Sequence, residues 1–153
     1  MNDYIHRVQY YETDQMAVVH HSNYIRWMEE ARVEFLDRHG IGFVTLEARG
    51  ILSPVVGVEC RYRRPTHFDE RIRVHVELRE YTGVRLRVEY EMYNDQSGEL
   101  VSTGASTHCF TNMQGRPISL QRDYPDVDAV LAAAVIPAKQ KDEYGTGQFR
   151  ILT

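Results

Sequence analysis

The sequence predicts an α+β domain in which an antiparallel sheet packs against one long helix. Residues 24–38 place their apolar side chains three and four positions apart, the spacing of a helix with one buried face. After residue 50 the period changes to two, and strand-like segments follow one another with short turn signals between them. A chain of 153 residues is typical of one domain that folds without disulfides or a metal.

The first half of the chain supplies the helix and one strand. Residues 4–11 are rich in aromatic and β-branched side chains, so a first strand is expected there. The link that follows leads into the helix at 24–38, and Ser22 or Asn23 has the side chain that a helix cap requires. Gly40 is expected to end the helix in the left-handed conformation that glycine adopts easily.

The second half of the chain has the pattern of antiparallel strands joined by tight turns. Residues 71–81 alternate apolar and charged side chains, which leaves one face of the sheet for water and the other for the helix. A helical turn is expected at 43–49 and a short amphipathic helix at 124–135. The strands are expected at 51–64, 71–81, 84–93 and 100–112.

Composition argues against several classes of protein. The chain has 18 Lys and Arg against 22 Asp and Glu, a net charge of −4, whereas nucleic-acid binders are usually basic. Its two cysteines form no disulfide framework, which favours a reducing, cytoplasmic location. No apolar run approaches the ~18 residues of a membrane span.

One domain is expected over 1–137, followed by a polar tail at 138–153 that is flexible or forms an interface.

Asp14 lies in the link that feeds the N-terminus of the long helix. The first backbone N–H groups of a helix lack intrahelical partners, so they stabilise a carboxylate placed nearby. One interpretation is structural, with Asp14 as a helix cap or a salt-bridge partner. The other is catalytic, with Asp14 as a base or nucleophile while amides near residues 21–23 stabilise an oxyanion. The local sequence does not decide between the two.

Two other groups of residues also have alternative interpretations. His20 and His21 are adjacent, but no zinc-binding spacing such as HxxxH accompanies them, so no metal site is predicted. Hydrogen bonding near Asp14 or packing at an interface fits His21 better. The arginines within 61–64 and 85–87 either cover a solvated face of the sheet or bind phosphate groups.

The stretch RVQYYETDQMAVVHHSNYIRWMEEAR at 7–32 resembles the hotdog-fold acyl-CoA thioesterases of the 4-hydroxybenzoyl-CoA thioesterase family, in particular their YbgC-like branch. A second match is YRRPTHFD at 62–69, similar to the family pattern Y-x-x-P-x-x-x-D, and the resemblance covers about 4–113. Ala17 departs from the pattern, which commonly has glycine there; a positive φ would strain alanine by about 1 kcal/mol. The first motif is carried by Thr13, Asp14, Val18, His21, Tyr24, Glu29, Ala31 and Arg32.

The resemblance implies a hotdog fold, an antiparallel sheet wrapped around one long central helix, and a set of residue roles. It implies that Asp14 is the catalytic carboxylate and that the backbone N–H of His21 polarises the thioester carbonyl, while the His21 side chain positions water or substrate. Tyr24 is expected to line the acyl pocket, and Arg63 and Arg85 to contact the phosphates of coenzyme A. In such enzymes the site lies between two subunits, so a homodimer or homotetramer is expected.

The function expected on this resemblance is hydrolysis of an acyl-CoA thioester to a free acid and CoA. No metal or redox cofactor is implied, since CoA is part of the substrate. Asp14 is expected to act either as a general base or as a nucleophile, and both roles stay open. The alternative is a hotdog domain that binds acyl-CoA or an acyl carrier protein without hydrolysis. The acyl group, and whether CoA or a carrier protein bears it, are not specified by the sequence.

Overall fold

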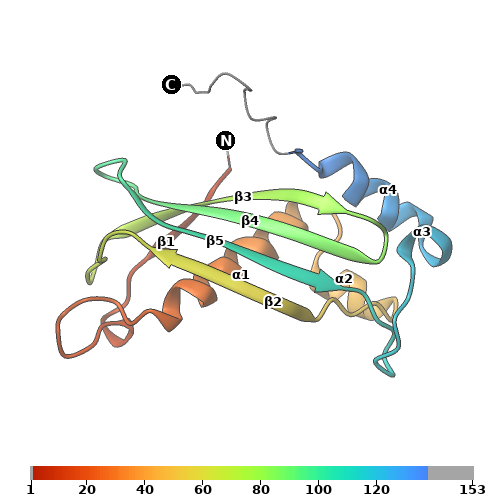
Figure 1. Cartoon of the computed structure of the whole chain (residues 1–153), viewed down its shortest axis with the longest axis horizontal. Coiled ribbons are helices and arrows are strands. Elements are labelled where there is room, and N and C mark those ends of the chain that lie inside the picture. Colours follow the sequence, from red (N-terminus) through yellow and green to blue (C-terminus); the bar gives the residue numbers. More distant parts are fainter. Residues whose placement is uncertain (1, 138–153) are drawn as a thin grey trace, which may run out of the picture.

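The structure is a computed structural model, and it describes residues 2–137. One antiparallel sheet has five strands in the order β1-β3-β4-β5-β2, and a long helix, α1 (Ser22–Arg38), lies across one of its faces (Figure 1). This arrangement confirms the predicted α+β class. The predicted tail at 138–153 lies outside the described residues. The strands are β1 (Tyr4–Arg7), β2 (Val55–Tyr62), β3 (Arg71–Tyr81), β4 (Arg85–Asn94) and β5 (Leu100–Cys109).

The helix α1 (Ser22–Arg38) begins slightly earlier than predicted, and its cap differs from the prediction. The N-cap residue is His21, whose backbone is helical and whose side chain makes no capping hydrogen bond. Asn23 lies inside the first turn, where its side chain donates to the carbonyl oxygens of Glu12 and His20. The prediction that Ser22 or Asn23 caps the helix is therefore wrong, because the preceding loop covers the helix start instead. No helix in the described range 2–137 is long and apolar enough to cross a membrane.

The first strand is shorter than predicted. β1 ends at Arg7, and the chain then turns into a short 3-10 helix, η1 (Tyr10–Glu12). The turn forms because the Glu12 carboxylate accepts a hydrogen bond from the Gln9 backbone N–H at 2.8 Å and enters the core. The helical segments expected later in the chain are present as α2 (Phe43–Ala48) and α4 (Pro125–Ala134), whereas α3 (Leu120–Asp123) was not predicted.

The core lies between α1 and the inner face of the sheet. Trp27, Met28 and Ala31 of α1 are buried there. Gly104 of β5 allows close packing, because a Cβ atom at this position would lie 2.8 Å from the Met28 sulfur. Each large apolar side chain buried in this way contributes about 1.5–3 kcal/mol to the free energy of unfolding. The sheet contributes the alternate residues Ile72, Val74, Val76, Leu78, Leu86, Val88 and Met92.

A chain of buried polar groups crosses this core from helix to sheet. Arg32 of α1 is 7% exposed, and its Nη1 donates to the Tyr90 hydroxyl at 2.9 Å. The Tyr90 hydroxyl lies 2.6 Å from Ser106 Oγ, which lies 2.8 Å from His108 Nε2. Because a guanidinium only donates, both hydroxyl protons are used when Tyr90 donates to Ser106 and Ser106 donates to a neutral His108. The Arg32 Nε atom has no acceptor among the described residues.

The neutral state of His108 makes the stability of the protein sensitive to acid. Burial, and then the positive charge of Arg32, lower the pKa of His108 from 6.5 to about 4. The unfolded chain takes up this proton near pH 6.5, so the free energy of unfolding falls by up to about 3 kcal/mol between pH 6.5 and 4.

His108→Gln keeps an acceptor for Ser106 but does not titrate, so it should remove this part of the acid sensitivity. Urea unfolding between pH 4 and 7 measures the difference, with the exposed His39→Gln as the matched control. Equal pH slopes for the wild type and His108→Gln would show that His108 is not responsible.

Candidate functional site

The loop that carries Asp14 is a tight hairpin. Thr13 and Val19 form an isolated antiparallel bridge, and the Asp14 backbone N–H donates to the Val18 carbonyl at 2.9 Å. One Asp14 carboxylate oxygen accepts the Met16 backbone N–H at 2.8 Å. Ala17 closes the turn with a φ of 65°, the left-handed conformation that alanine adopts at a cost. The expected strain at this departure from the family pattern is therefore present, and the loop closes in spite of it.

The buried residue Glu12 anchors both ends of this hairpin to α1. Its carboxylate accepts hydrogen bonds from Trp27 Nε1 and His6 Nε2, each at 2.9 Å. Its carbonyl oxygen accepts the His20 backbone N–H at 2.9 Å and the Asn23 side chain at 3.0 Å. Burial alone would raise the pKa of the Glu12 carboxyl, but the hydrogen bonds from Gln9, His6 and Trp27 lower it. Glu12 therefore remains a carboxylate at neutral pH.

Sequence reasoning missed Glu12 as a residue on which the site depends. Its partners lie on three different segments of the chain, and one buried carboxylate has no periodic signature. The only signal was its position two residues before Asp14, between a strand and a helix.

The start of α1 presents one backbone amide without an acceptor among the residues that the structure describes. The Ser22 N–H donates to His20 Nδ1, and the Asn23 and Tyr24 N–H groups donate to the carbonyls of His20 and His21. The His21 N–H has no acceptor within the described part of the chain. This amide lies at the positive end of the helix dipole, so it is suited to stabilise a developing oxyanion.

A hollow of about 290 Å³ lies beside this helix start. Tyr24 lines it, and the Tyr24 hydroxyl is held in the protein interior by a 2.7 Å hydrogen bond with Thr66 Oγ1. The hollow brings together three of the predicted site residues, His21, Tyr24 and Arg63. It is lined by Val19, His21, Tyr24, Tyr62, Arg63, Arg64 and Pro65.

Two predicted site residues lie elsewhere. Asp14 is in the adjacent hairpin but does not line the hollow of its own chain. Arg85 starts β4 and is paired with Cys109, whereas the Arg63 backbone N–H binds the Val101 carbonyl near the other end of β5. Eight residues of β5 separate the two positions, about 26 Å at the rise of a strand. Arg63 and Arg85 of one chain therefore cannot contact the same phosphate group.

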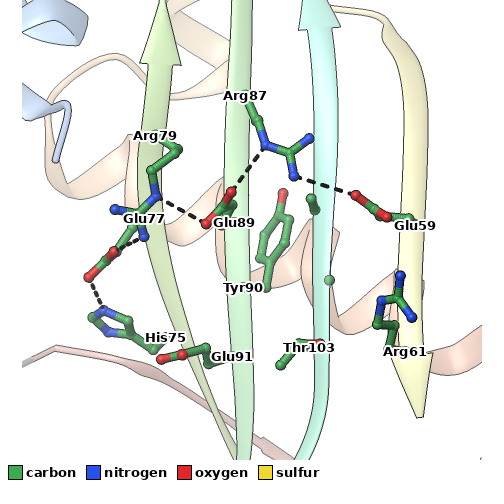
Figure 2. Close-up of a pocket in the computed structure, with 12 residues that line it drawn as sticks. Glu59, Arg61, His75, Glu77, Arg79, Arg87, Glu89, Tyr90, Glu91 and Thr103 are labelled. Carbon is green, nitrogen blue, oxygen red and sulfur yellow. Dashed lines mark hydrogen bonds and ion pairs between the residues drawn. The ribbon is translucent and has the colours of Figure 1, made fainter. Parts of the chain in front are cut away.

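A second hollow, of about 250 Å³, lies on the outer face of the sheet (Figure 2). Five of its charged side chains form one network: Arg79 binds Glu77 and Glu89, and Arg87 binds Glu89 and Glu59. Because the charges within this network largely neutralise one another, they leave only a weak field for a ligand. We therefore assign the candidate site to the hollow at the start of α1.

The adjacent histidines His20 and His21 belong to no metal-binding cluster in the described part of the chain. Within residues 2–137 no group of three or more His, Cys, Asp or Glu side chains is placed to hold an ion. His20 Nδ1 is 2.8 Å from Ser22 Oγ, and the His20 and His21 rings stack with their centroids 4.2 Å apart.

Comparison with known proteins gives the family to which this chain belongs. The family described as the thioesterase-like superfamily matches residues 8–142, more than half of the chain, and this chain belongs to it. YneP of Bacillus subtilis, a protein named for acyl-CoA thioesterase activity, is 37% identical over 120 residues, 78% of this chain and 86% of YneP. The acyl-CoA thioester hydrolase YbgC of Escherichia coli O157:H7 is 25% identical over 116 residues, 76% of this chain and 87% of YbgC.

Solved structures show the same fold. The DHNA-CoA thioesterase of Staphylococcus aureus superposes with a TM-score of 0.81 at 30% identity, over 85% of this chain and 87% of that one. The gentisyl-coenzyme A thioesterase BH1999 superposes with a TM-score of 0.73 at 25% identity, over 84% and 98% of the two chains. The chain therefore has the hotdog fold that its motifs predicted.

The left-handed conformation of Ala17 leads to a stability prediction. Ala17→Gly should raise the free energy of unfolding by up to about 1 kcal/mol, because glycine adopts a positive φ without strain. The added freedom of the unfolded chain reduces this gain. Urea unfolding of both proteins measures the change, and Ala48→Gly in the helix α2 should have the opposite sign. A destabilised Ala17→Gly variant would contradict the strained conformation.

Proposed function

We propose that this protein hydrolyses acyl-CoA thioesters at a site made from two copies of the chain. The observation that carries the proposal is the unused His21 N–H at the start of α1, beside a hollow lined by Tyr24 and Tyr62. Membership of the thioesterase-like superfamily supports the same reaction class. The thioester carbonyl lies at this amide, the acyl group enters the hollow, and CoA leaves across the surface.

Asp14 supplies the attacking oxygen or activates it. As a general base, its carboxylate takes a proton from water, the water oxygen attacks the carbonyl carbon, and the C–S bond then breaks. As a nucleophile, a carboxylate oxygen attacks directly, CoA leaves as the thiolate, and water hydrolyses the resulting anhydride. Both routes give the free acid and CoA. The His21 side chain positions water or substrate, and neither route uses a metal or a redox cofactor.

The His21 N–H stabilises the negative charge that develops on the carbonyl oxygen. One well-placed donor of this kind lowers the activation barrier by about 3–4 kcal/mol. The amide is preorganised before the charge develops, because the turns around it are closed by hydrogen bonds to His20. It therefore needs no reorganisation when the charge forms.

The second copy pairs with the first along the edge strand β2. Within the described chain β2 is bonded to β5 on one side only, and its side chains Val55, Val56 and Val58 are about half exposed. An apolar edge with unpaired backbone groups is stable when it pairs with another strand. A two-fold axis at this edge gives an antiparallel pair and one sheet across both chains. A tetramer formed from two such dimers extends the same proposal.

Pairing along β2 explains why Asp14 and Arg85 lie away from the hollow of their own chain. Antiparallel pairing brings the start of the partner's β2 beside the end of β2 in this chain. The partner's Arg85 then lies at the same end of the sheet as Arg63, so the two arginines together contact the phosphates of one CoA. Asp14, which does not line the hollow of its own chain, serves a site that both chains form.

The alternative is a domain that binds acyl-CoA or an acyl carrier protein without hydrolysis. Two features favour it: Ala17 in place of glycine, and the tail at 138–153, which lies outside the described residues. The loop closes with Ala17 at positive φ, and the Asp14 backbone keeps its hydrogen bonds to Ala17 and Val18.

Replacing the carboxylate tests the reaction. Asp14→Ala should lower kcat at least ~100-fold with the fold intact, because the water or the carbonyl loses its catalytic partner. Thiol release from short, medium, long and aromatic acyl-CoAs gives the rates, and circular dichroism checks the fold. Asp126→Ala, at an exposed ion pair on α4, is the control and should keep full activity. Near-normal turnover by Asp14→Ala would remove Asp14 from the mechanism.

Charging the edge strand tests the two-chain site. Val58 is 46% exposed on β2, and Val58→Lys should give a folded monomer with at least ~10-fold lower activity, because a lysine on an edge opposes strand pairing. Sedimentation at micromolar concentration gives the mass. Val44→Lys, at an 84% exposed position of α2, should leave both mass and activity unchanged. A fully active Val58→Lys monomer would contradict a site shared between chains.

A further inference from the structure

Tyr62 connects the edge strand to the start of the helix. It is the last residue of β2, and its ring packs edge-on against the rings of Tyr24 and His21, with centroids 5.0 and 6.1 Å away. Its hydroxyl donates a hydrogen bond to the carbonyl oxygen of His21 at 3.1 Å. Within residues 2–137 no other hydrogen bond joins β2 to the first turn of α1 or the residue before it.

The acceptor of this hydrogen bond lies at the very start of α1 and already has one donor. The His21 carbonyl is the N-cap carbonyl of α1, and it already accepts the Tyr24 backbone N–H at 3.2 Å. The Tyr62 hydroxyl gives the same oxygen a second donor, which comes from outside the helix. Two donors on one carbonyl restrict the rotation of the His21 backbone, and the unused N–H belongs to the same residue.

We infer that Tyr62 is a positioning residue for thioester hydrolysis, whose hydroxyl holds the His21 N–H in the orientation that an oxyanion requires. This inference rests on the hydrolysis proposed above. It also gives the edge strand a role in the chemistry, because β2 is the strand that pairs with the second copy. When β2 pairs with the second copy, its last residue, Tyr62, is held in position. The Tyr62 hydroxyl then holds the start of α1 through the His21 carbonyl.

The hydroxyl acts as a hydrogen-bond donor and not as a base. Burial and the neighbouring Cys60 raise the pKa of Tyr62 to about 12, so the phenol keeps its proton through the neutral range. The ring lines the hollow, whereas the hydroxyl is directed to the backbone. Loss of the hydroxyl alone should therefore change the rate of the chemical step and leave substrate binding unchanged.

Tyr62→Phe removes the hydroxyl and keeps the ring, and Tyr93→Phe is the matched control. Tyr93 lies on the outer face of β4, and its hydroxyl donates to Glu91 at 2.9 Å. Tyr62→Phe should lower kcat roughly five- to tenfold, the effect of one hydrogen bond, with KM within about twofold of the wild type. Its pH–rate profile should keep its shape, and Tyr93→Phe should match the wild type.

Backbone amide exchange gives a measurement that does not depend on activity. Exchange in residues 21–25 should be faster in Tyr62→Phe than in the wild type, and unchanged in Tyr93→Phe. Unchanged exchange together with an unchanged kcat would overturn the positioning role, and so would a raised KM at constant kcat. If the wild type hydrolyses no acyl-CoA while exchange still rises in Tyr62→Phe, the proposed function fails and the anchoring of α1 by Tyr62 stands.

Discussion

The Glu12 carboxylate, in a residue that is 4% exposed, joins parts of the chain that are distant in sequence. It receives hydrogen bonds from β1 through His6, from α1 through Trp27 and from the turn at Gln9. A buried carboxylate is costly unless donors surround it, so these partners have to be in place together. The hairpin that bears Asp14 starts from this anchor, and the Glu12 carbonyl binds the residues that lead into α1. The position of the loop relative to the helix start therefore depends on Glu12.

The regular parts of the fold could be predicted because each residue there contributes to one repeated pattern. The strand at 71–81 is found with the predicted ends, since its apolar and charged side chains alternate without interruption. The cap of α1 and the end of β1 could not be predicted in this way. The end of β1 depends on the hydrogen bonds of the Glu12 carboxylate, and the start of α1 on those of the Asn23 side chain; such contacts leave no periodic signal in the sequence. Local propensity for a cap or a strand is outweighed there by tertiary contacts.

The candidate site was predicted in part for a related reason. The motif at 13–24 identified Asp14, His21 and Tyr24, and the structure brings His21 and Tyr24 to one hollow. Arg63 and Arg85 could be placed relative to each other only after the register of β5 was known. Whether residues at opposite ends of a sheet cooperate depends on how a second sheet is joined to the first. The residues of such a site can be identified in a single sequence, but the symmetry that relates two copies of the chain cannot.

The polar chain from Arg32 to His108 has a consequence for how the helix is seated on the sheet. Apolar side chains tolerate sliding, since a leucine that loses one neighbour finds another. A polar contact does not, because a shift of α1 by one turn, about 5.4 Å, would move the Arg32 guanidinium away from the Tyr90 hydroxyl and leave it buried without this acceptor. The row of hydrogen bonds from Arg32 to His108 therefore forms at one position of α1 on the sheet. A misaligned packing would bury the charged Arg32 guanidinium without this acceptor, which raises its free energy. The correct alignment is therefore favoured when the helix packs on the sheet.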